Sequence, residues 1–137
     1  MRNILYALIV VCVADCLPLL AQTNKKLEFF ESKIRPVLVQ HCYDCHAADA
    51  KMLRGGLLVD SRQGLLEGGE SGPAVVPGEP EESLLISALR HDAFEMPPKQ
   101  KLSQVIIDDF KKWIRDGAED PRRETTEVAK PNLIDIE

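Results

Sequence analysis

The sequence contains few aromatic side chains: tryptophan occurs once, tyrosine twice and phenylalanine four times, together 5% of 137 residues. Beyond Leu20, long apolar runs are also scarce. A chain with so few large apolar residues has a small hydrophobic core for its length, as expected if a bound apolar group supplies part of the buried surface. The length limits the chain to one domain.

An excess of positive charge is also missing. The chain has 17 lysine and arginine residues against 22 aspartate and glutamate residues, a formal net charge of −5 at pH 7. Nucleic-acid-binding domains are usually basic, because phosphate contacts dominate their affinity. The composition therefore argues against nucleic-acid binding and slightly favours a basic protein partner. No Ser-His-Asp arrangement or close pair of carboxylates stands out as a catalytic site.

The N-terminal segment, residues 1–21, has the features of an export signal. It has a basic start, an apolar stretch interrupted by Asp15 and Pro18, and a small residue, Ala21, at its end. The stretch is short and interrupted for a stable membrane span, so we expect cleavage near Ala21, with an uncleaved membrane anchor as the alternative. Lipidation of Cys16 is disfavoured, because Asp15 occupies the position that requires a small residue. The sequence thus predicts a periplasmic or otherwise exported protein.

Cleavage would leave only two cysteines, Cys42 and Cys45, both within the run Cys42-Tyr43-Asp44-Cys45-His46. A C-x-x-C-H run is the covalent attachment site of a c-type haem. Two thiols at this spacing can form thioether bonds to one porphyrin, and the next imidazole then falls beneath the iron. We therefore predict one covalent haem c, attached through Cys42 and Cys45, with His46 as an iron ligand. The single motif makes two-haem peroxidase chemistry unexpected without a second chain.

Three other interpretations of the motif are weaker. A thioredoxin-like redox pair normally follows a strand, whereas this motif follows a predicted helix. A zinc site needs four ligands, and beyond Cys42, Cys45 and His46 only His41 and His91 offer further imidazole nitrogens. A structural disulfide would leave the following histidine unexplained.

Met96 is the candidate for the second axial ligand of the iron. Cytochromes c commonly bind a methionine thioether opposite the histidine, which favours reduced iron. The initiator methionine would be lost with the signal, and Met52 follows His46 too closely. Two prolines after Met96 restrict the loop and would hold the sulphur in place. His41 and His91 are alternative sixth ligands.

Apolar residues recur at helical spacing over residues 27–41, just before the motif. Pro36 lies inside this pattern and should bend or interrupt the helix near residues 32–33, because its ring clashes with the carbonyl four residues earlier. Residues 51–80 are rich in glycine and predict a compact loop, with Asp60 as the N-cap of a short helix.

Two further helices are predicted downstream. One begins at Pro80 and continues through Leu89, and the other is capped by Ser103 and ends at Gly117. Trp113 is interpreted as a core residue that packs this last helix against the first. The pattern predicts an all-α domain with about three main helices and loops around the haem.

The domain is expected to cover residues 22–121. From residue 118 onward the chain is charged, contains two prolines and lacks a helical pattern. These features are typical of a linker or disordered tail, which we assign to residues 122–137.

Residues 30–121 resemble the planctomycete-type cytochrome c domain. The resemblance rests on a series of short motifs: Ile34-Arg35-Pro36, Cys42-Tyr43-Asp44-Cys45-His46, Arg54-Gly55-Gly56-Leu57, Gly68-Gly69-Glu70-Ser71-Gly72-Pro73-Ala74-Val75-Val76-Pro77-Gly78, Pro80-Glu81-Glu82-Ser83-Leu84-Leu85, Met96-Pro97-Pro98 and Trp113-Ile114. It implies a single-haem, cytochrome c-like fold with His46 and Met96 as axial ligands. Members of this family typically carry the domain at the start of a longer exported protein, whereas this sequence ends at Glu137.

The leading hypothesis is an electron carrier rather than an enzyme, which exchanges single electrons with redox partner proteins. One alternative is a haem enzyme or gas sensor with an open sixth iron position. Another is a haem-bearing interaction module of a larger exported protein. Membrane association is expected only if the signal remains uncleaved.

Overall fold

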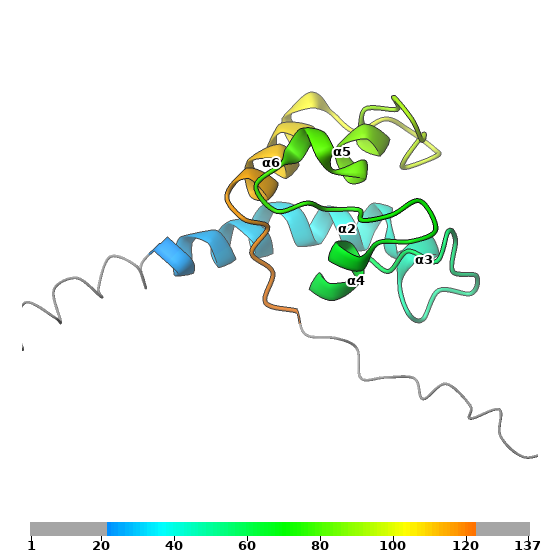
Figure 1. Cartoon of the computed structure of the whole chain (residues 1–137), viewed down its shortest axis with the longest axis horizontal. Helices are drawn as coiled ribbons and strands as arrows, with labels where there is room; N and C mark the ends of the chain where they lie inside the picture. The colour runs from blue at the N-terminus through cyan, green and yellow to red at the C-terminus, as the bar shows by residue number, and fades with distance from the viewer. Residues whose placement is uncertain (1–21, 123–137) are drawn as a thin grey trace, which may run out of the picture.

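The structure is a computed structural model that describes residues 22–122 (Figure 1). The predicted export signal and the tail after residue 122 lie outside these residues. The described part is helical and contains no β-strand, which confirms the predicted all-α class. Within it, every helix is too short or too polar to cross a lipid bilayer.

The first helical segment changes its hydrogen-bonding pattern part-way. Residues 22–29 are α-helical, and they continue into a π-helical segment, η1 (Phe30–Ile34), and then α2 (Arg35–His41). At the junction, the backbone N–H of Arg35 donates to the carbonyl of Phe30, five residues earlier. Pro36 has no N–H to continue the ordinary pattern, so a wider turn precedes it. The helical run thus changes its hydrogen-bonding pattern at residues 30–34, around the predicted position, but it is not interrupted.

The last helix, α6 (Gln104–Arg115), packs across η1. The ring of Trp113 lies 5.7 Å from that of Phe30 and 6.2 Å from that of Phe110, centroid to centroid. Trp113 is 3% exposed, and its indole N–H donates to the carbonyl of Glu119 at 2.8 Å. Trp113 is therefore the core residue that the sequence predicts.

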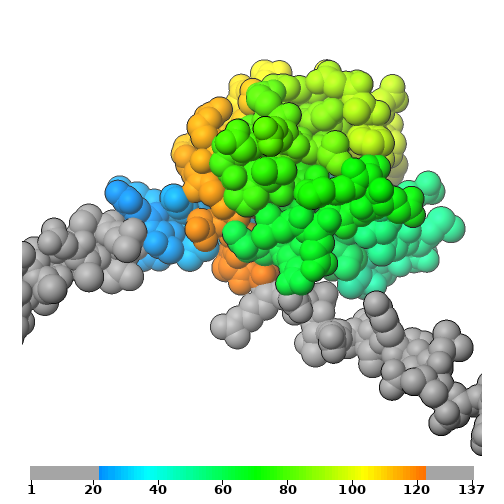
Figure 2. Space-filling model, viewed as in Figure 1, coloured from blue at the N-terminus to red at the C-terminus, as the bar shows by residue number. Residues whose placement is uncertain are grey.

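Four short elements lie between these helices: α3 (Tyr43–His46), α4 (Arg62–Glu67), η2 (Pro80–Glu82) and α5 (Leu84–Leu89). The helix predicted to start at Pro80 is thus divided into a 3₁₀ turn and α5. Ser103 directly precedes α6, as predicted, but its side chain makes no capping hydrogen bond. In Figure 2 the middle of the chain, in green, covers the centre of the visible face.

The predicted N-cap of α4 is wrong by one residue. The hydroxyl of Ser61 accepts the N–H of Gly64 at 3.1 Å and so caps the helix. Asp60 instead accepts the N–H of Ala48 at 2.7 Å. Aspartate and serine are both common N-cap residues, so the sequence alone does not choose between them. Here Asp60 bonds the loop after α3, and Ser61 caps the helix.

Residues 118–122 pack on the domain, although the linker-like composition begins at residue 118. Ala118 and Asp120 are buried. The guanidinium of Arg122 donates to the hydroxyl of Tyr43 at 2.7 Å and to the carbonyl of Val59 at 2.8 Å. Residues 118–122 therefore belong to the described fold.

Candidate haem-binding site

The C-x-x-C-H motif lies where α2 passes into α3. The N–H of Cys42 closes the last turn of α2 on the carbonyl of Leu38, and the N–H of His46 bonds the carbonyl of Cys42, both at 2.9 Å. Cys42 and Cys45 are half-buried free thiols. The motif therefore follows a helix, as predicted, and its two cysteines form no disulfide in this structure.

Next to the motif is a cavity of about 200 Å³, open on one side. It brings together Cys42, His46 and Met96 from separate parts of the chain. Figure 1 shows the loop after α5 above α3, at the same end of the molecule. The remaining lining residues come from α2, α5 and the loops: His41, Arg54, Gly55, Leu57, Val59, Gly69, Ser71, Gly72, Ala74, Leu84, Leu85, Ala88, Leu89, Phe94 and Pro97.

Two of the candidate residues do not line this cavity. Cys45 is outside its lining, although the carbonyl of Cys45 accepts the N–H of Arg54, a lining residue, at 3.0 Å. His91 is also outside it and has a left-handed backbone, with φ of +62°. Of the two alternative sixth ligands, only His41 lies at the cavity.

His46 has an unsatisfied ring nitrogen. Its Nδ1 atom is buried and has no hydrogen-bond partner among residues 22–122. Its backbone is firmly placed, because its carbonyl accepts the N–H of Val59 at 2.7 Å. Buried polar atoms normally have partners, so this imidazole at the wall of an apolar cavity fits the role of a ligand for a bound metal group.

The surroundings of Cys42 do not favour a redox thiolate. Burial raises the pKa of its thiol to about 11, and a redox nucleophile needs the thiolate. In the part of the chain that the structure describes, no three His, Cys, Asp or Glu side chains gather as a metal site. A single metal ion held by side chains alone therefore has no support here.

Met96 is half-buried at the cavity, after a loop that leaves α5. Its backbone N–H donates to the carbonyl of Ala88 at 3.3 Å, which ties the loop back to α5. The next residue, Pro97, is buried and joined to Met96 by a cis peptide bond. Met52, by contrast, is 67% exposed. The only described methionine at the cavity is therefore the one that the sequence predicts.

The walls of the cavity suit an apolar group with a few polar contacts. They consist mainly of aliphatic side chains from α5 and the two glycine-rich loops. Those loops are held together closely: a Cβ on Gly69 would overlap the carbonyl oxygen of Gly55. Glycine is needed here for the contact between two protein segments, in addition to any approach to a bound group.

Residues 42–100 match the model of the planctomycete cytochrome C family. This segment is a planctomycete-type cytochrome c domain. The matched residues of the cytochrome domain include Cys42, Cys45, His46 and Met96. Membership implies that the domain binds haem, and the apolar cavity beside His46 fits such a group. Comparison with curated proteins and with solved structures gave no significant match.

Sequence reasoning missed two residues of this region. Arg54 lines the cavity. Its position directly before two glycines, in one of the motifs shared with the family, could have marked it as a candidate. Arg122 supports Tyr43, which lies between the two cysteines. No local pattern marks this contact, because Arg122 and Tyr43 are far apart in the chain.

Proposed function

We propose that the cytochrome domain carries single electrons through one haem c attached to Cys42 and Cys45, outside the cytoplasmic membrane. The observation that carries this proposal is the cavity in which His46 and Met96 line the same apolar space as Cys42. A bound haem supplies one-electron chemistry, because its iron cycles between the ferric and ferrous states. The placement outside the membrane rests on the signal-like N-terminus.

The chain's own residues would hold and enclose the haem. Cys42 and Cys45 would tether it, while the imidazole of His46 and the thioether of Met96 would ligate the iron. A thioether ligand favours reduced iron and raises the reduction potential. The aliphatic walls from α5 and the loops would exclude water, which also tunes the potential.

The open side of the cavity is where a redox partner would exchange electrons. Phe94 lines the cavity and is 42% exposed, and Met52 and Leu53 are exposed in the loop next to Arg54. Exposed apolar residues beside an opening are typical of a contact surface for another protein. We propose that redox partners dock there.

The test is a comparison of visible spectra of the holoprotein, ferric and then ferrous, after expression with the export and haem-attachment machinery. We expect the weak far-red ferric band of methionine-to-iron coordination in the unmodified protein. Met96→Ala should remove this band, lower the reduction potential and let the ferrous protein bind carbon monoxide at neutral pH. Met52→Ala is the matched control and should change none of these properties.

Two results would count against the proposal. A far-red band that survives in the Met96→Ala protein would show that another residue is the sixth ligand. Carbon monoxide binding by the unmodified ferrous protein, together with turnover of peroxide, would indicate an open iron site and an enzyme or sensor. Cys42→Ala and Cys45→Ala should each weaken or prevent covalent attachment, which mass spectrometry of the denatured protein measures directly.

A further inference from the structure

Arg54 is an exposed cation at the mouth of an apolar cavity, without a side-chain partner among the described residues. It is the one lysine or arginine among the described residues that line the cavity. Its guanidinium forms no hydrogen bond or ion pair within residues 22–122. Arg35, Arg90 and Arg122 each pair with a carboxylate, whereas Arg62 and Arg115 are unpaired among the described residues but do not line the cavity. A cation that faces a binding cavity unpaired is suited to an anionic group on whatever fills that cavity.

The backbone holds Arg54 in place from both sides. Its N–H donates to the carbonyl of Cys45 at 3.0 Å, which links it to the attachment motif. The following Gly55 and Gly56 have φ of +59° and +61°, left-handed values that favour glycine. The carbonyl of Gly55 accepts the N–H of Glu70 at 2.9 Å. Arg54 is therefore fixed relative to both the motif and the second glycine-rich loop.

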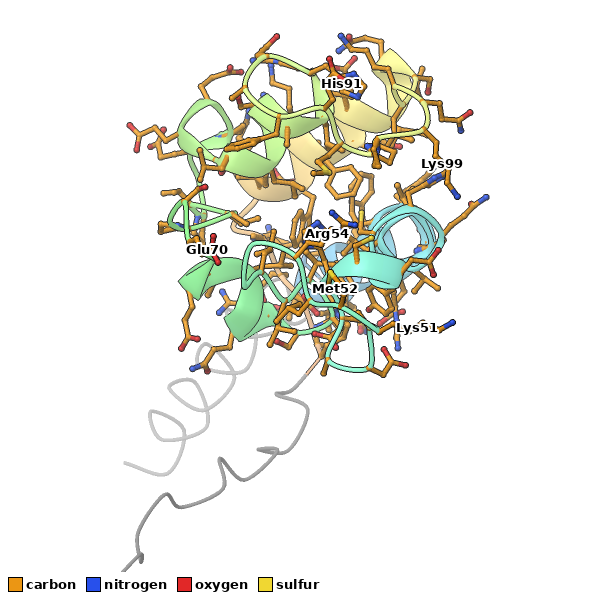
Figure 3. All side chains as sticks on the ribbon, turned by 90° about the vertical axis from the view of Figure 1, so that its right-hand side faces the viewer. Lys51, Met52, Arg54, Glu70, His91 and Lys99 are labelled. Atoms are coloured by element: carbon orange, nitrogen blue, oxygen red, sulfur yellow. The ribbon has the colours of Figure 1, made fainter. Side chains whose placement is uncertain are left out.

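The polar side chains of the cavity are unevenly distributed. Arg54 and Ser71 come from the two glycine-rich loops, which the Glu70 to Gly55 hydrogen bond joins. The wall formed by α5 is entirely aliphatic. Figure 3 looks onto this end of the molecule and shows Arg54 near the centre of the face, between His91 above and Lys51 below.

We propose that Arg54 binds a propionate carboxylate of the haem and thereby sets which edge of the porphyrin faces the glycine-rich loops. This inference rests on the proposed function of the domain. Haem is apolar over most of its surface and carries its two carboxylates on one edge, which matches a cavity with one cationic side. A guanidinium binds a carboxylate through two parallel hydrogen bonds, which fixes orientation as well as charge.

The bound carboxylate should be held in its ionised form. A cation within a few ångströms lowers the pKa of a carboxyl group by about 1–3 units, because it favours the charged state. Loss of the cation should therefore raise the pKa of the propionate. The titratable side chains that lie near the same space are His41, His46 and Glu70, so the readout must come from the propionate itself.

The experiment is a proton NMR titration of the ferric holoprotein, in which the resonances of the propionate methylene groups are followed against pH. Arg54→Gln should raise the midpoint of one propionate by about one pH unit or more, a tenfold or larger change in its acid dissociation constant. Lys51→Gln is the control. Lys51 is exposed in the same loop and does not line the cavity, so its removal should leave the midpoint unchanged.

Arg54→Lys should give an intermediate midpoint, because it keeps the charge and loses the planar pair of donors. If the Arg54→Gln protein cannot be produced in folded form, the midpoint of Arg54→Lys is the one to compare with that of the unmodified protein. Equal propionate midpoints in the Arg54 variants and the unmodified protein, with haem attached in all of them, would overturn the role of Arg54 alone. Failure of the unmodified protein to attach haem would overturn the proposed function and this inference together.

Discussion

Two regions of this domain differ in how fully their own side chains pack: the contact between the first helical segment and α6, and the side that bears the haem cavity. Between the first helical segment and α6, Phe30, Phe110 and Ile114 have no exposed surface, and the rings of Phe30 and Phe110 both pack against Trp113. These side chains fill the space between the two helices. A separate open cavity of about 400 Å³, lined in part by Phe29 and Lys112, lies outside this contact.

The cavity side leaves apolar surface and polar atoms without protein partners. Phe94 is 42% exposed, and the Nδ1 atom of His46 is buried without a hydrogen bond to the described residues. Arg54, at the same wall, has no partner among the described residues. The buried core is continuous between the two regions, so the difference lies at the cavity, where a bound haem would supply the contacts that the protein leaves open.

The largest effect should come from removing the haem. In a Cys42→Ala, Cys45→Ala double variant we expect a loss of more than about 5 kcal/mol of unfolding free energy, most of the stability of a small domain. A covalently held haem stays attached when the chain unfolds, but its packing and its iron ligation form only in the folded state, at the high effective concentration that the tether provides. Circular dichroism melting measures the loss. Hydrogen exchange should rise first in residues 84–97 and last in α6, and uniform exchange would contradict the comparison.

The helical side should fail independently of the haem. Phe110→Ala removes a ring with no exposed surface, and we expect it to cost about 3–5 kcal/mol through lost contacts and the cavity left behind. The visible spectrum of the holoprotein should not change, because Phe110 does not line the haem cavity. Val105→Ala, at a residue 70% exposed, should cost less than about 0.5 kcal/mol. A shifted spectrum in Phe110→Ala would mean that the two regions are coupled.

Arg122 contacts residues of both regions, so its replacement tests whether they are coupled. Its guanidinium lies 5.0 Å from the centroid of the Phe30 ring and bonds the hydroxyl of Tyr43. Arg122→Gln leaves the carboxylate of Asp120 buried without its cation, and we expect a loss of about 3 kcal/mol. Adding Asp120→Asn should restore part of that stability, and chemical denaturation of the single and double variants measures both. No recovery in the double variant would indicate that the contact with Tyr43 dominates.

The smallest effect should come from the surface near η2. Hydrogen bonds from Arg90 and Lys111 lower the pKa of Glu81 to about 2. A carboxylate with a lowered pKa stabilises the fold above its ordinary pKa and loses this effect as the pH falls through the folded value. The melting temperature of Glu81→Gln should therefore depend less on acid than that of the unmodified protein, between about pH 5 and pH 2. Glu79→Gln should retain the full dependence, and added salt should reduce the difference.

Sequence patterns predicted the helical side well, because helical periodicity and caps are local. The stripe before the motif and the end of α6 at Gly117 appear as expected. Met96 lines the same cavity as His46, and its role as the second axial ligand stays a prediction.

The remaining features depend on tertiary contacts that no short pattern encodes. The sequence does not distinguish Asp60 from Ser61 as the cap of α4; the hydrogen bond between Asp60 and Ala48, which are distant in the sequence, does. Arg54 lies at the cavity because two glycine-rich loops meet there. The contact between Arg122 and Tyr43 joins residues that are far apart in the sequence.

That last contact couples the end of the described chain to the attachment motif. Arg122 is the last described residue, and its guanidinium bonds the hydroxyl of Tyr43, the residue that directly follows Cys42. A change in the chain at Arg122 would therefore reach the proposed haem tether through a single side-chain contact.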